Sequence, residues 1–180
     1  MLRTIVMPVL LVLSVGCTMG LREEAVHRMG EQATVGPVVY NVLETEWRNQ
    51  LGNPLDPMIP KNKFLLVRLS IRNAGNQQVA VPLLNLVEVL DEDTPRSEGK
   101  TYLELSDVKG VPNWLGLLRL LEGADFVEGT IVFDVPAADY YLRITDGGAL
   151  EDERTALILL PLTLDTPGLE APTPTPGADL

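Results

Sequence analysis

Two segments of this chain alternate apolar and polar residues with a period of two. In the first, Lys63 to Arg72, one face of an extended strand carries only large aliphatic side chains, which are Leu65, Val67, Leu69 and Ile71. The second, Phe126 to Val135, repeats the pattern and stops at Pro136. Because successive side chains of a strand point to opposite faces, this period predicts β-strands, and helical spacing fits the same residues less well. The chain is therefore expected to build sheets with a buried face.

Shorter runs of strand-forming residues, separated by joints rich in Gly, Pro, Asn and Asp, fill the rest of the middle of the chain. They are Gln32–Val35, Val38–Trp47, Gln78–Val81, Leu84–Asp91, Thr101–Leu105, Tyr140–Thr145 and Thr155–Leu162. Many short strands in a domain of this length predict an all-β, two-sheet antiparallel sandwich. The apolar residues between Pro112 and Leu121 recur at helical spacing. They predict either one short helix near 112–121 or an apolar loop that closes one end of the sandwich.

The N-terminal segment has the layout of a secretory signal peptide. Arg3 precedes an eleven-residue apolar run, Ile5 to Val15, and Gly16 and Cys17 follow that run. A membrane-spanning helix needs roughly 20 apolar residues, about twice the length of this run. Residues 1–16 are therefore predicted to be a signal peptide that exports the chain and is then removed.

The end of this segment, Leu13 to Cys17, resembles the lipobox of bacterial lipoproteins, in which cleavage precedes an acylated cysteine. Cys17 is the only cysteine of the chain and is the predicted site of lipid attachment. Two or three acyl chains on one residue give lasting membrane attachment, whereas one chain gives only marginal attachment. The protein would then be anchored by lipid at the extracytoplasmic face of the cell membrane. The alternative is an unmodified Cys17 in a signal peptide that is cut elsewhere, for instance near Gly20.

Composition divides the mature chain into three parts. Residues 17–29 are polar and mixed in charge and are predicted to be a flexible tether. Residues 30–164 hold the strand pattern and are predicted to be the sandwich domain. Residues 165–180 are rich in Pro and Thr and contain no basic residue. Such a segment buries too little apolar surface to offset its ordering entropy, so we expect a disordered tail.

Charge and residue counts restrict the function classes. The chain has 14 Lys and Arg residues against 25 Asp and Glu residues, a net charge of −11 and a pI of about 4.5. An acidic protein lacks the basic surface that phosphate backbones require, so nucleic acid is not an expected partner. One cysteine and one histidine, His27 in the tether, exclude most zinc sites and histidine-based triads within one chain. We predict no catalytic residue, no metal and no cofactor.

Two acidic clusters offer oxygen atoms that a hard cation such as Ca²⁺ favours. The first is Asp91-Glu92-Asp93-Thr94 with Glu98, and the second is Asp146-Gly147-Gly148 with Glu151-Asp152-Glu153. The first cluster lacks the glycine and the final acid of an EF-hand loop. We therefore interpret the first cluster as a solvated connection and the second as a hairpin loop with glycines at positive φ.

The two tryptophans are the best candidates for binding, because tryptophan is enriched at interface hot spots. Trp47 shares strand parity with Val39 and Leu43, which predicts burial. Trp114 could be either buried or exposed. If it is exposed, the segment Val111–Leu118 is the predicted partner surface, with Val111, Trp114 and Leu115 as candidate contacts.

The order of several short motifs resembles a widespread family of bacterial secreted proteins and lipoproteins of unknown function. The motifs are Gly30-Glu31, Glu44-Thr45-Glu46-Trp47, Pro60 to Gly75, Leu121-Glu122-Gly123, and Gly129 to Pro136, which ends in Phe-Asp-Val-Pro. The resemblance covers about residues 30–164. It implies an immunoglobulin-like sandwich related to a mycobacterial immunoprotective extracellular antigen, and it supplies no catalytic residues. The telomeric-repeat-binding label of some members does not fit an acidic, exported chain.

These observations lead to one main hypothesis and two alternatives. The main hypothesis is an envelope-anchored, non-catalytic lipoprotein that binds another protein or an envelope component through its immunoglobulin-like domain. The first alternative is a secreted hydrolase that uses carboxylates, although no spacing among the acids selects a pair. The second alternative is a purely structural role, in which the domain is a spacer on the cell surface.

Overall fold

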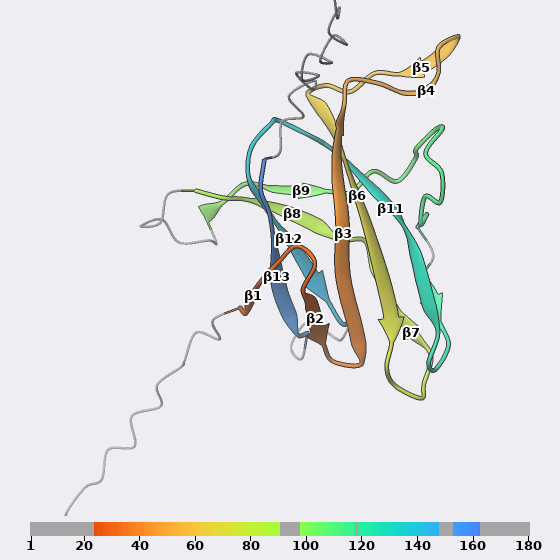
Figure 1. The fold of residues 1–180 in the computed structure, drawn as a ribbon, viewed down its shortest axis with the longest axis vertical. Helices are drawn as coiled ribbons and strands as arrows, with labels where there is room; N and C mark the ends of the chain where they lie inside the picture. Colours follow the sequence, from red (N-terminus) through yellow and green to blue (C-terminus); the bar gives the residue numbers. More distant parts are fainter. Residues whose placement is uncertain (1–23, 91–97, 118, 148–152, 163–180) are drawn as a thin grey trace, which may run out of the picture.

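The computed structural model describes residues 24–90, 98–117, 119–147 and 153–162, and two sheets packed face to face dominate it (Figure 1). The five-stranded sheet has the order β1-β13-β12-β8-β9 and the four-stranded sheet the order β11-β6-β3-β2. The strands of the five-stranded sheet are β1 (Val26–Arg28), β13 (Thr155–Leu160), β12 (Tyr140–Thr145), β8 (Asn85–Glu88) and β9 (Thr101–Leu103). Those of the four-stranded sheet are β11 (Phe126–Val135), β6 (Lys63–Asn73), β3 (Val38–Arg48) and β2 (Gln32–Val35). The predicted all-β sandwich is confirmed.

Two small antiparallel ribbons accompany the sandwich. The first pairs β4 (Leu51–Asn53) with β5 (Asp56–Met58) and projects from one end of the molecule (Figure 1). The second pairs β7 (Val79–Ala80) with β10 (Leu120–Leu121). None of the described residues forms a helix that is long and apolar enough to cross a membrane.

The main core lies between the two sheets and follows the predicted alternation. The four aliphatic residues of β6 that were expected to face inward are all buried there, together with Ile131 and Phe133 of β11 and Leu142 and Ile158 of the opposite sheet. At roughly 1.5–3 kcal/mol for each fully buried large apolar side chain, this cluster is the main source of stability.

A second, smaller apolar cluster lies on the outer face of the four-stranded sheet. It consists of Leu51, Phe64, Leu66 and Val132. The cluster is covered by Met58 and by Leu105, Val108 and Val111 of the segment after β9. Phe64 and Leu66 lie on the face of β6 opposite to the four inward aliphatic residues, and they are also buried, because the long connection from β9 to β10 folds over this face. That connection also forms one wall of the candidate site described below.

The first strand of the described chain differs from the sequence-based expectation. Val26–Arg28, placed in the tether by the sequence, form β1 and pair in parallel with β13. Leu157 N–H donates to the Ala25 carbonyl at 2.9 Å, and Thr155 Oγ1 donates to Glu24 at 2.7 Å. Three residues are too few to show a period, and their hydrogen bonds come from an edge more than 120 residues away in sequence. The sequence pattern therefore could not reveal this strand.

The optional helix near 112–121 is absent from the described part of that segment, so the segment is a loop, but it lies along the outer edge of β11 and does not close one end of the sandwich. Pro112 and Asn113 form a turn, and Asn113 has a φ of 53°. Gly116 has a φ of 65°. Residues with positive φ do not continue a right-handed helix, so the apolar spacing there has a different cause. Leu115 packs against the main core and Val111 against the outer cluster.

The Phe-Asp-Val-Pro motif at the end of β11 has a structural role. Phe133 and Val135 are buried in the core. Asp134 accepts hydrogen bonds from the main-chain N–H groups of Lys61 and Asn62 at 2.6 and 2.8 Å, which fixes the turn before β6. The Tyr140 hydroxyl donates to the Pro136 carbonyl at 2.8 Å. This last bond is similar to the tyrosine corner of immunoglobulin domains.

Candidate functional site

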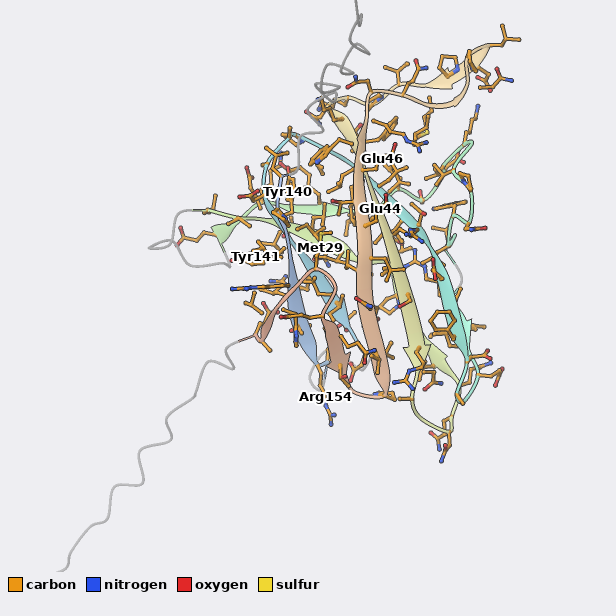
Figure 2. The ribbon with its side chains drawn as sticks, in the orientation of Figure 1. Met29, Glu44, Glu46, Tyr140, Tyr141 and Arg154 are labelled. Atoms are coloured by element: carbon orange, nitrogen blue, oxygen red, sulfur yellow. The ribbon has the colours of Figure 1, made fainter. Side chains whose placement is uncertain are left out.

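A groove of about 270 Å³ lies on the outer face of the four-stranded sheet. Strands β3, β6 and β11 form its floor, and residues 111–113 form its wall. Its lining is Glu44, Glu46, Arg48, Leu66, Arg68, Val111, Pro112, Asn113, Glu128, Gly129 and Thr130. Figure 2 shows Glu44 and Glu46 together on β3. Three glutamates and two arginines leave the groove with a net charge of −1.

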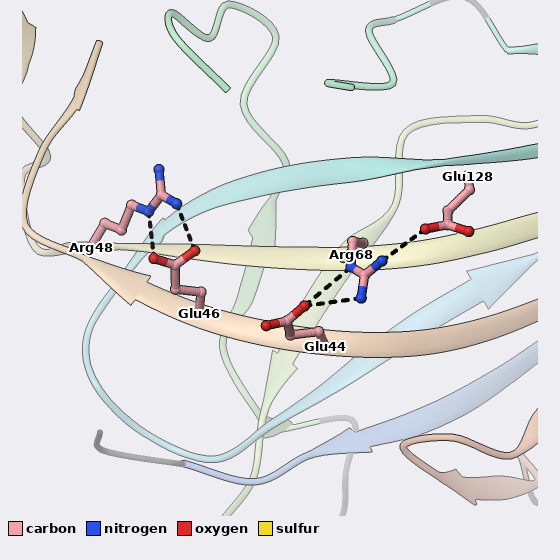
Figure 3. Close-up of polar contacts among 5 residues, drawn as sticks. All are labelled: Glu44, Glu46, Arg48, Arg68 and Glu128. Carbon is pink, nitrogen blue, oxygen red and sulfur yellow. Dashed lines mark hydrogen bonds and ion pairs between the residues drawn. The ribbon is translucent and has the colours of Figure 1, made fainter. Parts of the chain in front are cut away.

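A ladder of ion pairs crosses the floor (Figure 3). Arg68 of β6 donates through Nε to Glu44 of β3 at 3.1 Å and through Nη1 to Glu128 of β11 at 2.9 Å. Glu44 lies directly opposite Arg68, and Glu128 lies diagonally across from it. All three side chains are about half exposed, so the pairs contribute at most about 1 kcal/mol each. The ladder matters more for the arrangement of charge than for stability.

A second ion pair lies at one end of the groove. Arg48 donates to both carboxylate oxygens of Glu46 through Nε and Nη2, at 2.7 Å each (Figure 3). These hydrogen bonds raise the pKa of the Arg48 guanidinium. Two parallel bonds between a guanidinium and a carboxylate hold both groups in one plane. The end of the groove therefore presents a fixed, paired charge.

A β-bulge determines which residues of β3 face the groove. The register with β6 pairs Val42 with Leu69 and then Glu44 with Arg68, so Leu43 is the extra residue. Before the bulge, Tyr40 and Val42 face the core, and after it Thr45 and Trp47 occupy the inward positions. Without the extra residue, Glu44 and Glu46 would point into the core. The bulge thus creates the charged face, as bulges near functional sites often do.

The bulge also changes the prediction for Trp47. Trp47 packs against the main core and is half-buried, but it shares its face with Tyr40 and Val42 and not with Val39 and Leu43. The assumed parity was wrong because a bulge leaves no mark in an alternating sequence.

The wall of the groove covers the outer edge of β11. Leu105 N–H donates to the Val132 carbonyl at 2.7 Å, Thr130 N–H donates to Asn113 at 2.8 Å, and Leu115 N–H donates to Thr130 at 3.1 Å. An exposed edge strand invites pairing with other chains, and this segment satisfies part of that edge. Gly129 permits the close approach. A Cβ there would lie 2.5 Å from Leu115 Cδ2 and nearer still to the Asn113 carbonyl oxygen.

A buried ion pair joins the two ends of the connection from β9 to β10, which contains this wall. Arg119 donates through Nη2 to Glu104, and both side chains are almost completely buried. Arg119 also donates to the Gly116 carbonyl at 3.1 and 2.9 Å. Burial raises the pKa of Glu104 more than Arg119 lowers it. The sequence analysis missed this pair, although each residue is a single charge within an apolar run, Leu103 to Leu105 and Leu117 to Leu121.

Residues 27–153 match the model of a domain of unknown function, DUF4352. The chain belongs to the DUF4352 family. The yjhA protein of Bacillus subtilis has 12% sequence identity and a TM-score of 0.53, over 74% of this chain and 98% of that one. The ycdA protein of Bacillus subtilis, described as a candidate lipoprotein, has 15% identity and a TM-score of 0.50, over 73% of this chain and 38% of that one. These similarities confirm the predicted fold and family resemblance.

A secreted protein of Mycobacterium tuberculosis, MPT63, is also similar to this DUF4352 domain. It has 12% identity and a TM-score of 0.41, over 78% of this chain and 98% of that one. A similarity at that level carries no argument about function. No curated protein sequence matches the chain.

The three predicted contact residues, Val111, Trp114 and Leu115, have different neighbours in the DUF4352 domain. Val111 lines the groove and packs on the outer cluster. Trp114 is half-buried and forms a β-bridge with Thr130. Leu115 packs against the main core, so of the three residues it is the one directed inward. Partner binding by these residues stays a prediction.

The other candidate residues are only partly within the described chain. Cys17, the cluster Asp91–Thr94, and Glu151 and Asp152 lie outside it. His27 is half-buried in β1 of the DUF4352 domain. Gly147 has the expected positive φ, 69°. Among the described residues, no three side chains of His, Cys, Asp or Glu are grouped as a metal site.

Proposed function

We propose that this DUF4352 protein is a non-catalytic binding module, held at the outer face of the cell membrane by an acylated Cys17. Its groove on the four-stranded sheet would bind part of another protein or an envelope component. The export signal and the lipobox-like residues at the N-terminus support the location. The binding role is supported by the groove.

The groove is the observation that carries this proposal. It combines an apolar contact at Leu66 and Val111 with charged pairs at fixed positions. Pockets for small molecules usually measure about 300–1,000 Å³ and bury most of the ligand. At about 270 Å³, this groove suits one or two side chains of a larger partner better than a whole metabolite.

The hydrogen-bond partners of the groove carboxylates favour binding over carboxylate-based hydrolysis. A glycoside hydrolase needs one carboxyl group free to give a proton to the leaving group. Glu44, Glu46 and Glu128 each accept hydrogen bonds from an arginine. Groups in this arrangement are suited to charge recognition.

The proposal is tested by site-specific photo-crosslinking in the native type of host. A photoreactive residue replaces Asn113, which is exposed on the groove wall, and in a matched chain it replaces Ala137, which is exposed in the turn before β12. We expect a discrete adduct from position 113 and none from position 137. In an Arg68→Glu background, the 113 adduct should be lost, because that change places three acids side by side on the floor.

Two results would contradict the proposal. The first is the same set of adducts from both positions, which would indicate collisions without a site. The second is the absence of any adduct from position 113 in a correctly exported chain.

A further inference from the structure

Strand β3 is longer than the strand beside it, so part of its outer edge is uncovered. β2 pairs only with Val38–Asn41, and Gly30 N–H covers the next residue by donating to the Val42 carbonyl at 2.9 Å. Figure 1 shows β2 beside only one end of β3. From Leu43 to Arg48, the ladder of the four-stranded sheet is present on the β6 side alone.

The alternation of hydrogen bonds across the sheet shows which main-chain groups of this segment point outward. Thr130 of β11 bonds to the wall segment, so its N–H and C=O point away from β6. In an antiparallel pair these directions alternate, and partners directly opposite each other share the same kind of site. Arg68, opposite Thr130, therefore directs its main-chain groups to β3, and Glu44, opposite Arg68, directs its groups to β6.

Alternation along β3 then gives the direction for the remaining residues. Glu44 and Glu46 use their main-chain groups in the ladder with β6, whereas the N–H and C=O of Thr45 and Trp47 point away from it. Within the described ranges, no main-chain or side-chain group bonds to these four atoms from the outer side. The edge beyond the bulge is therefore a row of unpaired donors and acceptors, which is the template for strand addition.

We propose that this edge, Leu43–Arg48, binds an extended segment of a partner protein as an additional β-strand. The segment would alternate basic and apolar residues. Its basic side chains would lie next to Glu44 and Glu46, whose side chains are 62% and 44% exposed. Its apolar side chains would lie next to Trp47, which packs against the main core and is only half-buried.

Charge favours a basic partner segment over the chain's own C-terminal residues and over a second copy of the chain. A carboxylate offers about four acceptor sites, so Glu44 and Glu46 can accept further bonds beside those from Arg68 and Arg48. The chain's own residues 165–180 carry acids and no basic residue. In an antiparallel pair of two copies centred on Thr45, Glu44 of one copy would face Glu46 of the other. Like charges directly opposite are destabilising.

This inference rests on the proposed role as a binding module, but not on occupation of the groove. A failed crosslink at Asn113 would leave it standing, and a failed strand addition would leave the groove proposal standing. The two experiments are therefore separable.

The test uses the full mature chain and a fluorescent synthetic peptide of four Lys-Val repeats with blocked ends. The control peptide has the same side chains and charge, but its valine amides are N-methylated, so the edge that would face Thr45 and Trp47 cannot donate hydrogen bonds. We expect saturable binding that falls about tenfold or more with the N-methylated peptide. Equal binding of the two peptides would overturn the proposal, because it would show general attraction to an acidic protein.

Hydrogen exchange tests the same edge without reliance on affinity. In the free protein, the amides of Glu44 and Glu46 should exchange slowly and those of Thr45 and Trp47 rapidly. The peptide should slow exchange at Thr45 and Trp47. Slow exchange at both residues in the free, monomeric protein would overturn the proposal, and so would dimer formation seen by light scattering, because a second copy would then occupy the edge.

A matched pair of variants completes the test. Thr45→Pro removes an outward N–H that the β3–β6 ladder does not use, and Thr45→Val keeps that N–H with a similar shape. Only Thr45→Pro should lose peptide binding. Unchanged binding by a folded Thr45→Pro chain would overturn the proposal, and if that variant does not fold, the N-methylated peptide and the exchange pattern still decide the question.

Discussion

At the scale of single residues, the ion pair between Glu104 and Arg119 carries a high desolvation cost, because both side chains are almost completely buried. Two charges almost wholly removed from water require strong compensation, and their attraction often fails to supply it. The raised pKa of Glu104 has the same origin, because burial outweighs the effect of Arg119. We therefore interpret the pair as a device that fixes both ends of the connection from β9 to β10, at some expense of stability.

The first prediction concerns the loss of one partner. Arg119→Met should lower the free energy of unfolding by about 3–5 kcal/mol near pH 7, because an ionised Glu104 would remain buried without a counter-charge. The double variant Glu104→Leu/Arg119→Met should regain most of that loss. Urea unfolding of the three chains measures this, and a double variant as unstable as the single one would contradict the interpretation.

The second prediction concerns pH. A carboxyl group whose pKa is raised on folding binds more protons in the folded chain than in the unfolded chain. Its contribution to stability is therefore complete below the ordinary carboxyl value of about 4.3 and is lost as pH rises through the raised value. Relative to Glu104→Gln, the wild type should lose stability as pH increases across that window. A relative gain with increasing pH would show that the attraction of Arg119 dominates.

At the scale of elements, the groove depends on a connection that lies on a strand edge. Gly129 is the point of closest approach. Gly129→Ala should lower the free energy of unfolding by about 1–3 kcal/mol, because the new methyl group displaces Asn113 and Leu115 from β11. Ser70→Ala, on the outer face of β6, is the control and should stay within about 0.5 kcal/mol of the wild type. Equal stability of the Gly129 and Ser70 variants would contradict the described contact.

Strand β1 is the second element that can be tested by itself. A chain that begins at Met29 lacks β1 and leaves the outer edge of β13 unpaired. It should lose about 1–3 kcal/mol of stability relative to a chain that begins at Arg22, and it should aggregate more readily. Equal melting temperatures and equal solubility of the two chains would show that β1 does not contribute to the sheet.

The strands with a long run of alternating apolar and polar residues were predicted from the sequence, and the features without such a run were missed. Leu65, Val67, Leu69 and Ile71 repeat often enough to define both a strand and its buried face. The bulge at Leu43, by contrast, changes the face of Glu44 and Glu46 through one extra residue, and alternation cannot show where it falls. The helical spacing of the apolar residues between Pro112 and Leu121 was misleading, because Asn113 and Gly116 have positive φ and so interrupt a right-handed helix.

At the scale of the whole molecule, the two sheets have different relations to the N-terminal end of the described chain. The described chain enters at Glu24, which bonds to Thr155 and Arg143 of the five-stranded sheet. The groove and the open edge of β3 belong to the four-stranded sheet. The proposed anchor would therefore leave the candidate binding features on the sheet that does not receive the N-terminal segment.

Acylation of Cys17 would determine where a partner must be sought, so the proposed anchor is the first feature to test. The most direct measurement is the intact mass and membrane partitioning of the protein expressed in its native type of host, compared with Cys17→Ser. We expect a wild-type chain that begins at Cys17, carries acyl mass and partitions with membranes, and a Cys17→Ser chain that loses the acyl mass and the membrane association. A free wild-type polypeptide that begins near Gly20 and accumulates in the medium would contradict it.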